Sequence, residues 1–198
     1  GNPVPRVGYR HPLLDHRAPV TAASVLSDDE LDDLSDSFVE AAVVASDAGF
    51  DFVDVKACHG YLLHEMLSGI DRPGPYGGDL GGRSRFHVRT LEAIRDRVPS
   101  LGLGVRLSIF DMVPFESGQD GVGVPVSTGR YRYAFGGDGT GLGIDLDEPD
   151  RLLALFAEVG VSMVCTTAGS PYHCPHVQRP AYFPPSDGYL PQIGRAHV

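Results

Sequence analysis

An α/β fold built on a parallel sheet is predicted by three observations. Helical and strand patterns alternate along the 198 residues, in the order helix then strand, three times. The 25 glycines and 16 prolines indicate long loops rather than a helical bundle. Two architectures fit this order, a (β/α)8 barrel and an open doubly wound sheet. Because a barrel needs about 250 residues, three strands predict at most part of one.

Three helices are predicted from caps and apolar spacing. The first begins after Ser27, which forms a capping box with Glu30, and ends at Gly49. The second covers about residues 82–98. The third starts near Asp147 and ends at Gly160.

Each predicted helix is followed by a short apolar segment that reads as a strand. These segments are residues 50–58, 103–108 and 161–167. Residues 1–26 show neither a helical nor a strand periodicity and are expected to be an extended surface segment. Residues 109–144 are Gly-rich, lack a helical period and are expected to form a long, irregular loop.

Composition excludes some function classes. The net charge of −10 argues against nucleic-acid binding, which needs a basic surface. No apolar run approaches the roughly 20 residues of a membrane span, which predicts a soluble protein without membrane partners. The three cysteines form no CxxC pair, so a reducing cytoplasm is expected rather than a disulfide framework.

The last six residues, 193–198, match what a common sequencing adaptor encodes in one frame, followed by a stop codon. They are therefore interpreted as an artefact and excluded from the fold. On this interpretation residues 1–192 are an internal fragment of one domain of a longer protein.

Candidate chemistry follows the strands, because active sites of parallel α/β folds lie beyond the carboxyl ends of the strands. Lys56 and His59 could polarise a carbonyl oxygen, and the Tyr61 phenol could protonate the adjacent carbon. The alternative is structural: Tyr61 packs on the rim of the sheet and His59 caps a helix.

Arg106 ends an apolar strand and therefore needs a partner, either a carboxylate such as Asp111 or an anionic ligand. A further alternative is a metal-dependent barrel hydrolase that uses four histidines. These are His59, His64, His173 and His176. Their spacing matches neither HExxH nor a regular zinc motif.

A string of motifs in a fixed order resembles the Old Yellow Enzyme family of NADH:flavin oxidoreductases. Its core is Asp54-Val55-Lys56-Ala57-Cys58-His59-Gly60-Tyr61-Leu62-Leu63-His64-Glu65. The string continues with Leu67-Ser68, Arg72, Tyr76-Gly77-Gly78, Arg83-Ser84-Arg85-Phe86, Gly104-Val105-Arg106-Leu107-Ser108, Ala168-Gly169-Ser170-Pro171-Tyr172 and Pro175-His176-Val177-Gln178-Arg179-Pro180. Two departures stand out: Lys56 replaces the usual His, and Gly81-Gly82 replaces Glu-Asn.

The resemblance implies part of an FMN-binding (β/α)8 TIM barrel, about three βα units long. It implies hydride transfer from NADH or NADPH through FMN to an electron-poor small molecule such as an α,β-unsaturated carbonyl. Arg106 matches the arginine beside the flavin N1/O2 edge. Lys56 and His59 match the pair that binds the substrate oxygen, and Tyr61 matches the proton donor.

The resemblance also implies that strands which contact the flavin lie outside this chain. The fragment is therefore expected to be inactive alone, and the full-length parent is a possible homo-oligomer. A truncated product without function is the non-enzymatic alternative.

Overall fold

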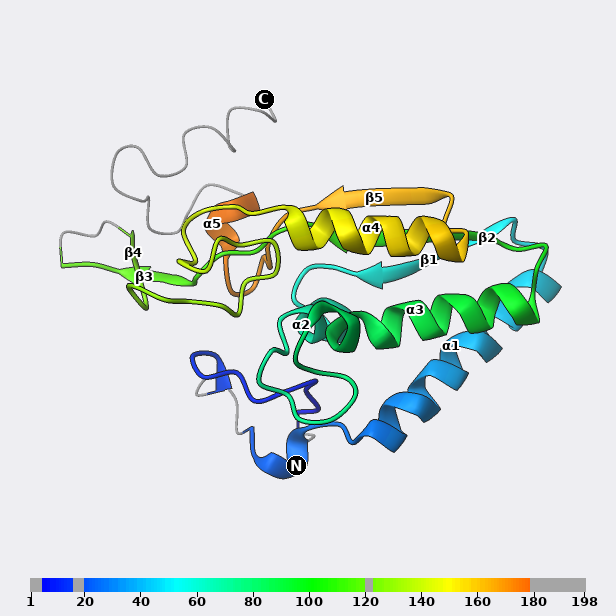
Figure 1. The fold of residues 1–198 in the computed structure, drawn as a ribbon, viewed down its shortest axis with the longest axis horizontal. Coiled ribbons are helices and arrows are strands. Elements are labelled where there is room, and N and C mark those ends of the chain that lie inside the picture. The colour runs from blue at the N-terminus through cyan, green and yellow to red at the C-terminus, as the bar shows by residue number, and fades with distance from the viewer. Residues whose placement is uncertain (1–4, 16–19, 120–122, 179–198) are drawn as a thin grey trace.

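The chain is described by a computed structural model that covers residues 5–15, 20–119 and 123–178. Its centre is a sheet of three parallel strands, β1 (Phe52–Ala57), β2 (Gly102–Ser108) and β5 (Met163–Thr167), in the order β1-β2-β5 (Figure 1). The predicted parallel α/β fold is confirmed. The described residues do not close the sheet into a barrel.

Three long helices pack on one face of this sheet. They are α1 (Asp28–Asp47), α3 (Leu80–Arg97) and α4 (Asp147–Val159), which lie along the strands in Figure 1. α3 contacts both α1 and α4. The sheet contributes alternate residues to the shared core, namely Val55, Ala57, Leu103, Val105 and Leu107. Burial of these apolar side chains fixes which face of each strand turns toward the helices.

The helix boundaries follow the predicted caps. Ser27 Oγ accepts the Glu30 N–H at 3.1 Å, and Glu30 Oε2 accepts the Ser27 N–H at 2.8 Å, so the capping box is confirmed. α4 ends where Gly160 adopts a left-handed φ of 99°. α3 begins two residues earlier than expected, because Asp79 caps it by accepting the Gly82 N–H at 2.9 Å.

Several local expectations were wrong. Residues 5–15 are not a surface segment, because Tyr9 and His11 are only 2% and 7% exposed. Two short helices, α2 (Leu62–Leu67) and α5 (Pro175–Gln178), and the 3-10 turn η2 (Ala22–Ser24) escaped prediction. The loop after β2 contains an antiparallel hairpin of β3 (Phe115–Ser117) and β4 (Gly123–Pro125).

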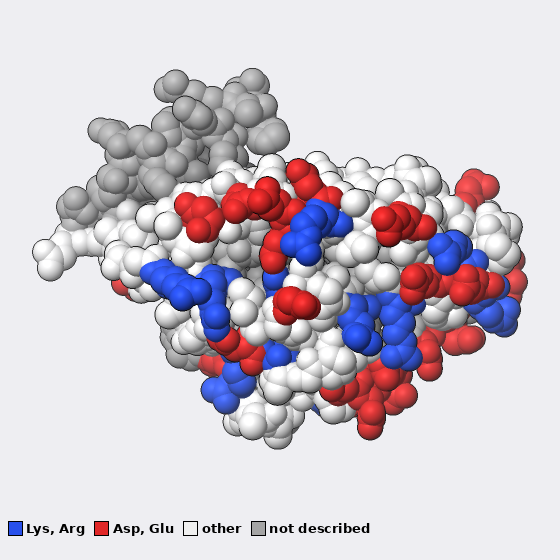
Figure 2. Space-filling model, viewed as in Figure 1, with Lys and Arg blue, Asp and Glu red and all other residues white. Residues whose placement is uncertain are grey.

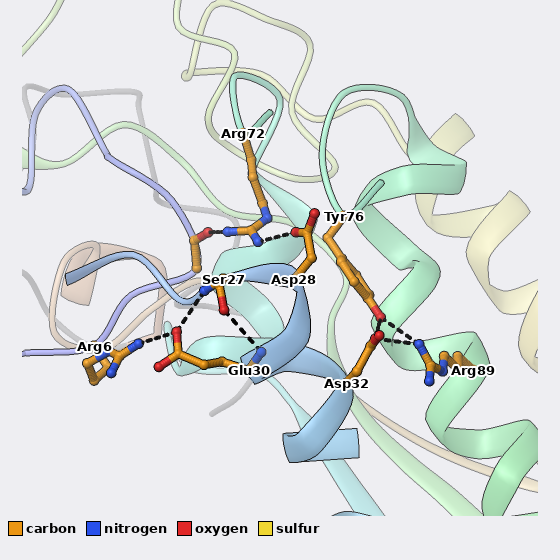
Figure 3. Close-up of polar contacts among 9 residues, drawn as sticks. Arg6, Ser27, Asp28, Glu30, Asp32, Arg72, Tyr76 and Arg89 are labelled. Carbon is orange, nitrogen blue, oxygen red and sulfur yellow. Dashed lines mark hydrogen bonds and ion pairs between the residues drawn. The ribbon is translucent and has the colours of Figure 1, made fainter. Parts of the chain in front are cut away.

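A polar network ties the N-terminal segment to α1 and to the loop before α3 (Figure 3). The buried Arg72 guanidinium donates to the Gly8 carbonyl at 2.6 Å and to Asp28 Oδ1 at 2.7 Å. Nearby, Asp32 accepts hydrogen bonds from Tyr76 and Arg89. Arg72 therefore joins three segments that are distant in sequence.

Charge is mixed on the face shown in Figure 2. Lys and Arg side chains alternate there with Asp and Glu, and acidic side chains gather over the beginning of α1. Among the residues described, no helix is both long and apolar enough to cross a membrane.

Replacing Arg72 tests the network. We expect Arg72→Met to lower the free energy of unfolding by about 2 kcal/mol, because the Gly8 carbonyl loses its charged donor and Asp28 its partner. Arg89→Met makes the same change at an exposed ion pair and should cost less than about 1 kcal/mol. Urea unfolding measures both, and equal losses would contradict the role given to Arg72.

Candidate functional site

The face of the sheet opposite the helices carries charged side chains in register. Lys56 of β1 lies beside Arg106 of β2, which lies beside Cys165 of β5. Asp54, two residues before Lys56, points to the same face because strand side chains alternate. The alternation that buries Val55 and Ala57 therefore places two cations next to each other at the carboxyl end of the sheet.

Arg106 binds a carboxylate, but not the one expected. Its Nη2 donates to Asp54 Oδ2 at 2.7 Å, and the two side chains are 44% and 29% exposed. Of the two alternatives, the structure shows a carboxylate partner, but it is Asp54 rather than Asp111, which lies near His64. Arg106 Nε is buried and has no hydrogen-bond partner among the described residues. Another group would therefore meet the exposed part of the guanidinium rather than this buried nitrogen.

The turn after β1 is strained and tightly packed. His59 has a φ of +64°, the only positive value at a non-glycine residue in the described chain. Its N–H donates to Ser108 Oγ at 3.2 Å, which ties the turn to the end of β2. Gly60 has a φ of +74°, and a Cβ atom there would lie 2.3 Å from Ser170 Oγ and 3.0 Å from Ser170 Cβ, so a side chain at this position would be strained. Such strain of about 1–3 kcal/mol is common at functional sites.

Tyr61 follows this turn and lies against Lys56. The Lys56 ammonium is 3.7 Å from the centre of the Tyr61 ring, a cation–π contact. The Tyr61 hydroxyl is 3.1 Å from that of Tyr172, and the two rings meet edge to face. Tyr61 is 48% exposed, so its phenol is open to a ligand.

The electrostatics of the site favour a neutral His59. Partial burial lowers the pKa of His59, and the positive charges of Lys56 and Arg106 lower it further. A neutral imidazole can donate one hydrogen bond and accept another. Lys56 is the only lysine in the chain, and Arg106 is already paired with Asp54. Among the described residues, the site therefore combines one cation without an ion pair, one paired cation, a neutral imidazole and an exposed phenol.

Sequence reasoning missed two residues here, Asp54 and Tyr172. Asp54 could have been found from the two-residue alternation that links it to Lys56. Tyr172 belongs to the motif Ala168-Gly169-Ser170-Pro171-Tyr172. It is 111 positions from Tyr61 in the sequence, and only the fold brings the two side chains together.

The four histidines of the metal-hydrolase alternative do not form a metal site. Within the described chain, no group of three or more His, Cys, Asp and Glu side chains is placed to hold an ion. His64 is buried and its Nδ1 accepts the Gly60 N–H at 2.8 Å. The structure therefore gives this alternative no support.

Comparison with known proteins identifies the family. The sequence model of the NADH:flavin oxidoreductase / NADH oxidase family matches residues 7–129, more than half of the chain. The chain belongs to this family. The predicted resemblance is confirmed, and the matched range includes Lys56, His59, Tyr61 and Arg106.

Individual relatives match over shorter stretches. The 12-oxophytodienoate reductase 1 of Oryza sativa subsp. japonica is 41% identical over 87 residues, which are 43% of this chain and 23% of the relative. An NADH:flavin oxidoreductase of Gibberella zeae is 34% identical over 92 residues, 45% of this chain and 22% of that protein. The crystal structure of Old Yellow Enzyme from Pichia sp. AKU4542 aligns with a TM-score of 0.40 and 29% identity, covering 43% of this chain and 23% of that one. The match thus spans about a quarter of the length of these relatives.

Glu65 of α2 has a structural role that its pKa makes testable. Its Oε1 accepts the Gly8 N–H at 3.0 Å and the Tyr9 N–H at 3.4 Å. Burial raises the pKa of Glu65 from 4.5 to about 7. The folded state therefore favours the protonated acid, and this stabilisation is complete below pH 4.5 and lost as the pH rises through about 7.

We expect Glu65→Gln to remove this pH dependence while keeping the accepting oxygen. The free energy of unfolding of the wild type, relative to the variant, should fall by on the order of 2 kcal/mol between about pH 4 and pH 8. Glu40→Gln, at an exposed position of α1, controls for the loss of a surface charge. Parallel stability curves for the wild type and Glu65→Gln would contradict the assignment.

Proposed function

We propose that this chain is part of an FMN-dependent oxidoreductase that transfers hydride from NADH or NADPH to an electron-poor small molecule. The observation that carries the proposal is the family match, which spans the row of Lys56 and Arg106 at the carboxyl end of the sheet. Relatives named 12-oxophytodienoate reductase support an α,β-unsaturated carbonyl compound as the acceptor.

The residues of the open face fit a flavin. Arg106 offers a positive charge on a side chain that is 44% exposed, which suits the electron-rich N1/O2 edge of the ring system. Asp54 holds the guanidinium in place. FMN, when bound, supplies the two-electron carrier that amino-acid side chains lack.

Three other residues are assigned to the substrate. We assign Lys56 and His59 to the substrate oxygen, where their hydrogen bonds would polarise a carbonyl. Tyr61 would donate its phenolic proton to a substrate carbon. The exposure of the Tyr61 ring and its position 3.7 Å from the Lys56 ammonium support this role, because they place the phenol beside the residue assigned to the substrate oxygen.

We also propose that residues 1–192 belong to a single (β/α)8 barrel domain, of which β1, β2 and β5 are three strands. Met163 and Val164 lie on the edge strand β5 and are 44% and 41% exposed. Such exposed apolar side chains at a sheet edge support further strands beside β5. Residues 193–198, predicted to be an adaptor artefact, lie outside the described residues. A cytoplasmic location and a homo-oligomer remain predictions.

A coupled assay tests the proposed function. The protein expressed from its complete gene and loaded with FMN should oxidise NADH or NADPH when cyclohex-2-enone is added. Cyclohexanone, which lacks the activated double bond, is the matched control and should give only the background rate. Equal rates with the two ketones, or a rate that does not depend on FMN, would refute the proposal.

Tyr61→Phe tests the proton donor. The loss of the phenolic hydroxyl should lower kcat for cyclohex-2-enone by about 10²-fold or more and leave flavin reduction by the nicotinamide nearly unchanged. Tyr172→Phe removes the neighbouring hydroxyl and should have a much smaller effect. A larger loss in Tyr172→Phe than in Tyr61→Phe would move the role of proton donor to Tyr172.

A further inference from the structure

A cavity lies apart from the sheet face that is proposed to bind the flavin. It has a volume of about 200 Å³ and lies between the N-terminal residues 5–15, α2 and the loops that follow β2 and β5. Gly60 and Ser170 form part of its wall. Lys56, His59, Tyr61 and Arg106 do not line it, so the cavity is separate from the site already described.

His64 lines this cavity and has an unpaired polar atom among the described residues. Its side chain is 3% exposed, and its Nδ1 accepts the Gly60 N–H at 2.8 Å. Burial lowers the pKa of His64 to about 3, so the ring is neutral and carries its hydrogen on Nε2. This Nε2–H has no hydrogen-bond partner among the described residues. Asp111 Oδ2 lies 3.9 Å away, too far for a direct hydrogen bond.

Tyr131 presents a second donor. His11 Nδ1 accepts the N–H groups of Leu13 and Leu14, both at 3.1 Å, so His11 carries its hydrogen on Nε2. That hydrogen is donated to the Tyr131 hydroxyl oxygen at 3.2 Å. The hydrogen of Tyr131 itself is therefore available to another acceptor. Burial raises the pKa of Tyr131, which keeps the phenol neutral.

No described residue of the cavity wall offers a positive charge to an anion. The cavity lining includes the carboxyl groups of Asp15, Glu65 and Asp111, and neither Lys nor Arg among the described residues. A protonated amine suits the carboxylates, but it has no lone pair to accept the His64 hydrogen. A hydroxyl group meets both needs, because it accepts from His64 Nε2 and donates to Asp111 Oδ2. An oxygen about 2.8 Å from both atoms would see them at an angle of about 90°, a reachable geometry.

Much of the remaining wall is apolar and aromatic. The Tyr9 and Tyr133 rings stack with centroids 6.3 Å apart, and the Tyr131 and Tyr133 rings meet at 5.8 Å. Val7 and Met112 add aliphatic surface. These groups suit a small hydrocarbon or aromatic body.

We propose that this cavity binds a small neutral molecule with one hydroxyl group on an apolar or aromatic body. The hydroxyl bridges His64 Nε2 and Asp111 Oδ2, and the body lies against the rings of Tyr9 and Tyr131. The alternative occupant is a single water molecule that bridges the same two atoms.

Four ligands that share one benzene ring and differ in its substituent distinguish these possibilities. They are benzyl alcohol, benzylamine, benzoate and toluene, titrated into the protein purified from its complete gene and followed by NMR. The proposal predicts saturable binding of benzyl alcohol with a dissociation constant at least tenfold lower than that of the other three. No saturable binding of benzyl alcohol would overturn it in favour of a bridging water. Equal binding of toluene or benzylamine would overturn the hydroxyl specificity.

Variants locate the ligand. In Asp111→Asn, Oδ1 still accepts the Met112 N–H, but the amide nitrogen replaces the accepting Oδ2. Benzyl alcohol should then bind at least tenfold more weakly, whereas the exposed Asp96→Asn makes the same change without effect. Leu14→Trp, which fills the cavity from a half-buried wall position, should abolish binding and provides a second test if Asp111→Asn does not fold. Undiminished binding in a folded Asp111→Asn or Leu14→Trp variant would place the ligand elsewhere.

Discussion

The parallel register of β1 and β2 is the constraint on which the rest of the structure depends. Val55 pairs with Val105 and Ala57 with Leu107, and all four are buried against the helices. Because side chains alternate along a strand, the charged residues between them must lie on the opposite face. A shift of one residue in either strand would bury a cation and expose the core. The apolar core thus fixes the position of the charged row.

The N-terminal segment has a larger part in the architecture than its composition suggested. Its backbone is held by Glu65 and by the Arg72 guanidinium, and Tyr9 and His11 are buried beneath it. These contacts join residues more than 50 positions apart, which no local pattern records. The same segment completes the wall of the cavity beside His64. One side of the 58–61 turn therefore faces the open sheet, and the other side faces the cavity beside His64.

Much of the fold could be predicted from the sequence, because local physics determines it. The capping box at Ser27, the terminal Gly160 and the apolar strands are short-range signals. The ends of parallel strands share one edge of a sheet, and this rule selected Lys56, His59, Tyr61 and Arg106.

What could not be predicted depends on tertiary contacts. The partner of Arg106 is Asp54, which is set by strand register rather than by proximity in sequence. Helix α2 has six residues, too few to show a helical period. The hairpin of β3 and β4 has three residues in each strand. The pairing of Tyr61 with Tyr172 needs β1 and β5 to lie in one sheet.

The visible absorbance spectrum of the protein, purified from its complete gene, tests the central claim most directly. The account predicts a flavin band that bleaches when NADH or NADPH is added without oxygen and returns when an α,β-unsaturated ketone follows. The amount of FMN released by denaturation should be close to one mole per mole of protein. A spectrum without a flavin band, in a folded protein supplied with FMN, would contradict the account.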